Sequence, residues 1–149
     1  MTLIRRTVPT TVLLLTAGLA AAVVPATGAS AADPIDGPQT SGDVLFPHVG
    51  NGGYDAQHYD LDLAWTPGAS LAASTLQATA EMTAETTGSP LRSFSLDFEP
   101  GAMTVGAVTV DGVAAAFELV QDADAIKHKL VVTPTVPVEG EFTVAVTYG

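Results

Sequence analysis

Strict alternation of apolar and polar residues runs through this chain and limits what it can fold into. Over residues 75–85 the alternation continues for eleven positions without an exception, and it recurs over the eight residues 58–65. A period of two places every second side chain on the same face of an extended strand. The chain is therefore predicted to form half-buried β-strands, each with one apolar and one polar face.

The first 31 residues are predicted to be a secretory signal peptide. Arg5 and Arg6 form a basic start, residues 12–24 form an uncharged apolar run, and Ala29-Ser30-Ala31 supplies a cleavage pattern. The alternative is a membrane anchor, but this run is too short to cross a bilayer, which takes about 20 residues. We therefore expect a secreted, extracellular protein. General secretion is favoured, and the twin-arginine route stays open.

After signal cleavage the chain is strongly acidic and contains no cysteine. Three basic residues, Arg92, Lys127 and Lys129, then face 16 acidic ones, a net charge of −13. Such a charge repels nucleic acid and anionic lipid, so the sequence predicts neither nucleic acid nor a membrane as a partner. Without disulfides the fold depends on a hydrophobic core, for which about 115 mature residues are enough.

The mature chain is predicted to contain a tether and one β-domain. Residues 32–47 have three prolines, two glycines and no periodicity, so they are interpreted as a tether that becomes ordered where Val44-Leu45-Phe46 dock. Residues 48–149 carry turn signals every eight to twelve residues. The expected strands cover residues 56–65, 75–85, 92–98, 103–110, 126–133 and 141–148, together with a return strand that follows an Asp111-Gly112 hairpin and runs through Phe117 and Leu119 to Val120. This spacing predicts an all-β fold, either an antiparallel sandwich or an open, saddle-like sheet.

The alternation also predicts which side chains are buried. The inward positions include Tyr59 and Trp65, which we interpret as core residues and not as a platform for stacking sugars. The other core residues expected are Leu61, Leu63, Leu96, Phe98, Val144 and Val146, and the exposed residues expected are His58, Asp60, Thr79 and Glu81.

No set of residues in this sequence is predicted to perform catalysis or to bind a metal or cofactor. The chain lacks a His-Glu-x-x-His zinc motif, and its histidines lie in separate expected elements: His48, His58 and His128. No serine stands in a nucleophile elbow. Residues 50–53 are a glycine-rich bend before a strand and not before a helix, so they lack a phosphate cradle.

The acidic pairs do not predict a calcium site either. Asp60 with Asp62, and Asp122 with Asp124, lack the glycine and the distal glutamate of a calcium-binding loop.

The last expected strand, residues 141–148, ends beside the final residue of the sequence. A bare terminal strand rich in β-branched residues is an aggregation hazard. This observation leads us to expect that the β-domain is incomplete and belongs to a longer protein.

Five motifs, taken in order, resemble the start of a secreted bacterial aminopeptidase N-type zinc metallopeptidase, a gluzincin. The family's opening strand commonly reads Tyr-Asp-x-x-His-Tyr-Asp-Leu-Asp-Leu, and residues 54–63 match it. The alternating stretch 76–86 follows, and then Leu96-Asp97-Phe98, a Val-x-Val-Asp-Gly hairpin at 108–112 and Leu-x-Val-x-Pro at 130–134. The resemblance covers about residues 42–149.

The resemblance implies a non-catalytic N-terminal β-domain that packs against a thermolysin-like catalytic domain and helps to close its substrate cavity. The family's Gly-x-Met-Glu-Asn motif, its zinc helix and its catalytic tyrosine have no counterpart in these 149 residues. The chain alone is therefore expected to be inactive and to hold no cofactor, with zinc expected in the catalytic domain. Two alternatives stay open: a free-standing immunoglobulin-like binding module at the cell surface, and a purely structural exported β-domain.

Overall fold

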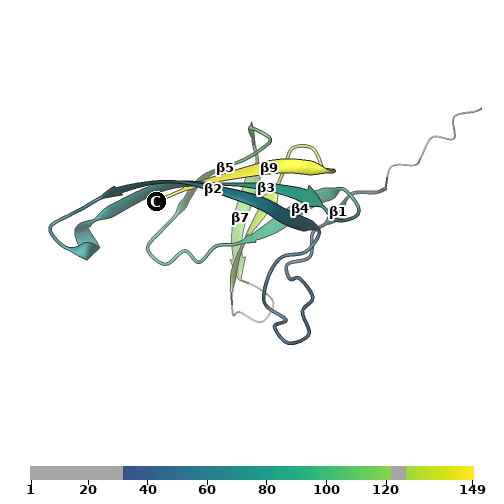
Figure 1. The fold of residues 1–149 in the computed structure, drawn as a ribbon, viewed down its shortest axis with the longest axis horizontal. Helices are drawn as coiled ribbons and strands as arrows, with labels where there is room; N and C mark the ends of the chain where they lie inside the picture. Colours follow the sequence, from purple (N-terminus) through teal and green to yellow (C-terminus); the bar gives the residue numbers. More distant parts are fainter. Residues whose placement is uncertain (1–31, 122–126) are drawn as a thin grey trace, which may run out of the picture. The chain divides into compact units, whose positions relative to one another are not determined.

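The computed structural model describes residues 32–121 and 127–149, and these fold almost entirely as β-structure (Figure 1). The elements are β1 (Ile35–Asp36), β2 (Tyr54–Thr66), the single turn η1 (Leu71–Ala73), β3 (Thr75–Thr86), β4 (Leu91–Asp97), β5 (Val105–Val110), β6 (Val113–Ala114), β7 (Ala116–Gln121), β8 (His128–Thr133) and β9 (Glu141–Tyr148). The predicted signal peptide and the pair Asp122 and Asp124 lie outside the described residues. The described residues include no helix of the length and apolarity needed to cross a membrane.

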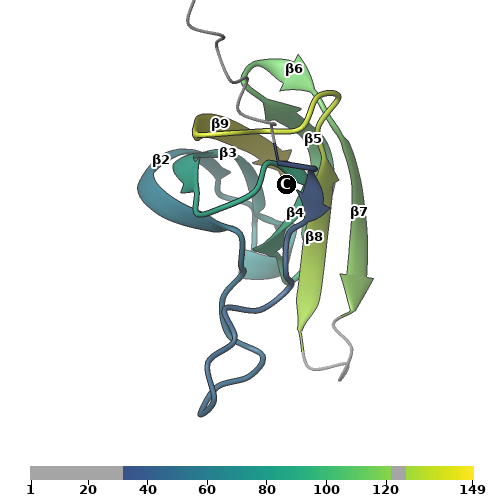
Figure 2. The same ribbon diagram turned by 90° about the vertical axis from the view of Figure 1, so that its right-hand side faces the viewer.

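The strands form two sheets that lie as separate layers (Figure 2). One sheet has five antiparallel strands in the order β2-β3-β9-β5-β6. The other has four strands in the order β1-β4-β8-β7, antiparallel except for the short β1, which runs parallel to β4. The prediction of an all-β fold is confirmed.

One predicted strand is divided between the two sheets. Asp111 and Gly112 both have positive φ, 49° and 75°, which is the backbone of the tight hairpin that their sequence predicts. This hairpin pairs β6 with β5, and the chain then continues into β7 of the other sheet. The return strand expected after this hairpin, running through Phe117 and Leu119 to Val120, is therefore two strands: β6 pairs with β5 in the five-stranded sheet, and β7 pairs with β8 in the other sheet.

The segment predicted as a tether contributes β1 to the fold. Arg92 donates hydrogen bonds to both carboxylate oxygens of Asp36, from Nε at 3.1 Å and from Nη2 at 2.9 Å. The hydroxyl of Ser93 donates a third, at 2.8 Å. These hydrogen bonds, first from Arg92 and then from Ser93, lower the pKa of Asp36 to about 2. An ion pair therefore fastens β1 to β4.

We expect the Asp36 carboxyl group to titrate near pH 2, well below the ordinary value of 3.8. Because folding lowers this pKa, the stabilisation by Asp36 is present above pH 3.8 and is lost as the pH falls toward 2. Carboxyl-carbon NMR of Arg92→Met should show the midpoint moving back toward 3.8. Lys127→Met removes the same charge without touching Asp36 and should leave its midpoint in place. A wild-type midpoint equal to that of Arg92→Met would refute the ion pair.

The hydrophobic core fills the space where the two sheets overlap. Phe94 of β4 and Phe142 of β9 have ring centroids 5.1 Å apart, and Tyr54 packs edge-on against both rings. Val144 and Val146 are buried, as predicted. The other buried apolar residues are Ala78, Met82, Ala84, Leu91, Val108, Val110, Leu130, Val132 and Val138.

The prediction that the apolar residues of β2 are buried is wrong. Tyr59, Leu61, Leu63 and Trp65 lie on the face that the alternation predicts, since they stand opposite Met82, Ala80, Ala78 and Leu76 of β3. Each of the four is nevertheless 53–57% exposed. The reason is that β2 is the outermost strand of its sheet, and that β7 and β8 run across the direction of β2 and β3, so that they cover only part of that sheet (Figure 1).

The other burial predictions have mixed outcomes. Leu96 and Phe98 are half-buried and not fully enclosed. His58, Asp60 and Glu81 are exposed, as expected, whereas Thr79 is half-buried.

Two further expectations need correction. The final strand β9 is not a bare edge, because it lies between β3 and β5, and the long free edge of the sheet belongs to β2. The side chains of Val44, Leu45 and Phe46 do not dock but are 62–93% exposed at the tip of the loop before β2. The carboxylate of Asp43 shapes that tip by accepting hydrogen bonds from the backbone N–H groups of Leu45 and Phe46.

Candidate functional site: an open apolar face beside strand β2

The three histidines of this chain lie in different elements of the fold. His48 lies in the loop before β2, His58 on the outer face of β2, and His128 at the start of β8, where its Nδ1 is 3.1 Å from Glu99. Within residues 32–121 and 127–149, no three histidine or acidic side chains gather closely enough to hold a metal ion. What the described fold offers instead is surface, in the form of a hollow and an exposed apolar stripe.

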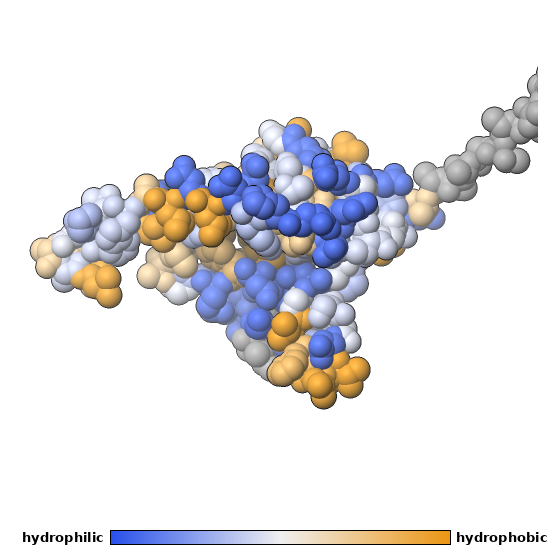
Figure 3. All heavy atoms as spheres, in the orientation of Figure 1, coloured by the Kyte–Doolittle hydropathy of each residue, from blue (hydrophilic) through white to orange (hydrophobic). Residues whose placement is uncertain are grey.

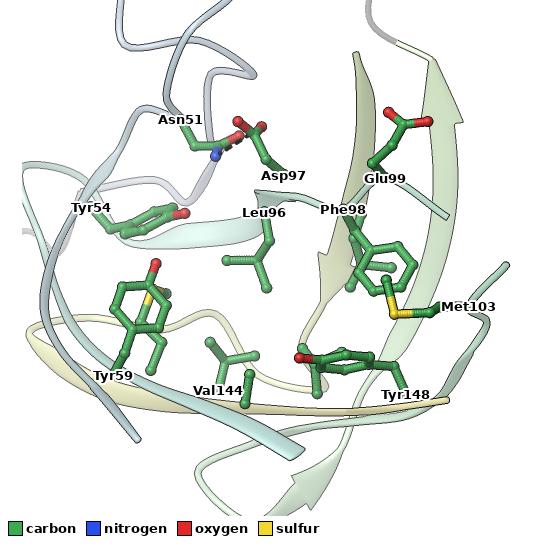
Figure 4. Close-up of a pocket in the computed structure, with 14 residues that line it drawn as sticks. Asn51, Tyr54, Tyr59, Leu96, Asp97, Phe98, Glu99, Met103, Val144 and Tyr148 are labelled. Atoms are coloured by element: carbon green, nitrogen blue, oxygen red, sulfur yellow. Dashed lines mark hydrogen bonds between the residues drawn. The ribbon is translucent and has the colours of Figure 1, made fainter. Parts of the chain in front are cut away.

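The hollow opens where the two sheets diverge and has a volume of about 530 Å³. Leu96 and Phe98 line it from the four-stranded layer, opposite Val144 and Tyr148 of β9 (Figure 4). The rings of Phe98 and Tyr148 meet edge to face at 5.7 Å. Its other lining residues are Asn51, Tyr54, Tyr59, Ala80, Met82, Asp97, Glu99, Met103, Leu130 and Val146. The hollow therefore has apolar walls and a polar rim.

Two tyrosines close one side of the hollow as neutral phenols. Tyr54 donates a hydrogen bond from its hydroxyl to the backbone oxygen of Ser95 at 2.8 Å. Burial raises the pKa of Tyr54, with smaller contributions from Tyr59 and Asp97. Burial, followed by the charge of Asp97, also raises the pKa of Tyr59. These side chains consequently bring hydroxyl groups to the hollow but no charge.

A buried lysine stands behind the polar rim. Lys129 is 0% exposed, and its ammonium group donates to Asp97 at 2.5 Å, to the backbone oxygen of Gly50 at 3.0 Å and to the side-chain oxygen of Asn51 at 3.2 Å. All three ammonium hydrogens thus have an acceptor. Lys127 adds a second ion pair to Asp97 at 3.3 Å. We call these five residues the Lys129 cluster.

The Lys129 cluster keeps Asp97 ionised. Burial by itself raises the pKa of Asp97. The hydrogen bonds and charges of Lys129, and then of Lys127, together lower this pKa by more than burial raises it, so the net pKa is below the ordinary value. A buried ammonium group paired with an ionised carboxylate avoids the large cost of an isolated buried charge.

The glycine-rich bend over residues 50–53 is what covers this lysine. Gly50 and Gly53 have φ of 74° and 90°, which side chains rarely permit. A Cβ added to Gly52 would approach the backbone oxygen of Thr40 to 2.9 Å. The glycines therefore let the bend pack closely against residues 38–41, where Gly50 and Asn51 accept hydrogen bonds from Lys129, and the bend has a structural role that the sequence alone did not predict.

Beside the hollow lies an apolar stripe along β2. We define the β2 stripe as Tyr59, Leu61, Leu63 and Trp65, and Tyr59 belongs to both the stripe and the hollow. Figure 3 shows hydrophobic surface on the arm formed by β2 and β3, and again at the tip of the loop before β2. Exposed apolar surface of this kind is typical of sites that bind another protein, a membrane or a ligand.

Comparisons with known proteins indicate which kind of protein contains a β-domain like this one. No protein-family model matches the chain, and no curated protein does. Solved structures do match. A two-domain M1 zinc metallopeptidase bound to L-arginine is 26% identical over 74% of this chain, with a TM-score of 0.52. The M1 zinc metallopeptidase of Deinococcus radiodurans gives the same three values.

This chain resembles the M1 zinc metallopeptidases. Yeast LTA4 hydrolase bound to bestatin shares the fold, with a TM-score of 0.51 and 20% identity over 64% of this chain. The resemblance that the sequence motifs predicted is thus confirmed by the M1 structures.

The chain spans only a small part of these M1 proteins. It covers 24% and 23% of the two 26% identical structures and 14% of yeast LTA4 hydrolase. What it matches is therefore one β-domain of a much larger M1 polypeptide.

Proposed function

We propose that these residues form most of the non-catalytic N-terminal β-domain of an exported M1-type zinc metallopeptidase. The observation that carries the proposal is the match itself: structures 26% identical to this chain align with 74% of it but with less than a quarter of their own length. The ordered motifs from residue 54 to residue 134 support the same assignment.

In this proposal the role of the domain is to pack against the catalytic domain and to help close its substrate cavity. The hollow and the β2 stripe supply an uncovered apolar surface of the kind such packing requires. The hydrolysis, the zinc ion and the catalytic groups belong to the catalytic domain. The residues of this chain contribute shape and surface, and not chemistry, to the reaction.

A second candidate is a free-standing binding module, which the exposure of Tyr59 and Trp65 favours, because exposed aromatic rings are common in binding surfaces. The two candidates make different predictions about the transcript that encodes this chain. We expect its reading frame to continue into a segment with a His-Glu-x-x-His zinc motif. A stop codon after Gly149, with no such frame downstream, would exclude the peptidase domain and favour the free-standing module.

A further inference from the structure

The free edge of β2 is long and regular, and its two faces differ in chemistry. β2 pairs only with β3 among the described strands, and from Tyr59 to Thr66 this pairing runs without a bulge. The opposite edge of β2 consequently presents its N–H and C=O groups to solvent. Natural proteins rarely leave an edge of this length unprotected, because it can pair with any extended chain.

The two faces of this edge differ in charge as well as in polarity. The β2 stripe is on one face, and Asp60 and Asp62 are on the other. Asp60 stands directly opposite Glu81, so acidic groups already neighbour one another there. The strands of this sheet, all within the described residues, contain no Lys or Arg. Its acidic residues are Asp55, Asp60, Asp62, Glu81, Glu85 and Glu141.

We propose that the free edge of β2 receives an extended strand with apolar residues at alternate positions and Lys or Arg between them. Its apolar side chains join the β2 stripe, and its basic side chains lie beside Asp60 and Asp62. We assign this strand to the same larger polypeptide, and this part of the inference rests on the proposed function. Strand addition of this type uses backbone hydrogen bonds for affinity and alternate side chains for specificity.

A second copy of this chain is a poorer occupant of the edge. Pairing β2 with its own copy would bring Asp60 and Asp62 of both molecules together on one face, and like charges beside one another across strands are destabilising. The mature chain also carries a net charge of −13, so two copies repel each other at low salt. A strand with the opposite charge removes both obstacles.

The test measures the binding of short synthetic peptides to residues 32–149. One labelled peptide alternates valine and lysine, a second alternates valine and glutamate, and a third has the composition of the first in a scrambled order. We expect the first peptide to bind about tenfold more tightly than the second, from two cross-strand charge pairs. Hydrogen exchange should show that it protects amides of β2. The scrambled peptide should bind weakly, because it cannot place all its apolar groups on one face.

Charge reversal supplies the decisive control. The double variant Asp60→Lys, Asp62→Lys should invert the preference so that the valine–glutamate peptide binds better, which a misfolded variant would not do. Glu118→Lys with Glu139→Lys changes the total charge equally at exposed positions elsewhere and should keep the original preference.

Several results would overturn the inference. Equal binding of the scrambled peptide would reduce the effect to non-specific charge attraction. Protection of amides in β7 or β6, and not in β2, would place the peptide-binding site elsewhere. A dimer whose β2 amides are protected without any peptide would assign the edge to a second copy of this chain. If the peptides behave as expected but the transcript stops after Gly149, the edge chemistry stands while the proposed function and the assignment of the strand to the same polypeptide both fall.

Discussion

Asp97→Ala is expected to lower the free energy of unfolding by about 3–5 kcal/mol, because it leaves the buried Lys129 ammonium without its counter-charge. The backbone oxygen of Gly50 and the side chain of Asn51 would remain as acceptors, but neither carries a charge. Chemical denaturation at neutral pH measures the change. Lys127→Met serves as the matched control: it removes the outer, half-exposed ion pair and should cost about 1 kcal/mol or less.

A double-mutant cycle separates the ion pair from general damage to the loop. In a Lys129→Met background no buried charge remains, so Asp97→Ala should then cost about 1 kcal/mol or less. Because folding lowers the pKa of Asp97, its contribution is present above the ordinary value of 3.8 and is lost as the pH falls through the lower, folded value. The difference in the free energy of unfolding between wild type and Asp97→Ala should therefore become smaller in acid. Equal costs of Asp97→Ala in both backgrounds would contradict the account of a stranded charge.

Phe94→Ala is expected to cost about 3–5 kcal/mol, since it removes a fully buried ring from the centre of the core. The ring packs against Tyr54 and Phe142, so its loss leaves a cavity that both sheets border. Leu63→Ala, by contrast, truncates a side chain that is more than half exposed and should cost about 1 kcal/mol or less. Thermal or denaturant unfolding of the two variants measures the contrast. A cost for Leu63→Ala equal to that of Phe94→Ala would mean that the β2 stripe is covered in solution.

Local sequence pattern predicted the strands and their faces well. Thr75–Thr86 and Glu141–Tyr148 form strands almost as the alternation predicts, because a period of two depends only on each strand's own residues. The Asp111-Gly112 hairpin was also predictable, since few residues adopt its positive φ values.

Burial was less predictable, because it depends on what lies above a face and not on the face itself. Leu61 and Leu63 have the sequence signature of core residues, yet the second sheet does not reach them. The position of β9 in the middle of its sheet likewise follows from the order in which distant strands pair, which no local pattern contains.

The Lys129 cluster escaped sequence analysis for a related reason. Lys129 occupies a position that alternation assigns to the outer face of β8, beside Val131, and outer lysines are normally solvated. In the fold its ammonium group meets Asp97 and also Gly50 and Asn51, which lie almost eighty residues earlier in the chain. The glycine run was visible in the sequence, but nothing in the sequence connected it to this lysine.

The most direct test of the proposed domain assignment uses the native protein from the organism that encodes this chain. An antibody raised against residues 32–149 should capture from the culture medium a polypeptide several times larger than these residues. The captured protein should release a fluorophore from a fluorogenic aminoacyl substrate. It should lose that activity when its metal is chelated and regain it when zinc is added. Purified residues 32–149, assayed alongside, should release none. Capture of a polypeptide no larger than these residues, without zinc-dependent release, would contradict the assignment to an M1 metallopeptidase.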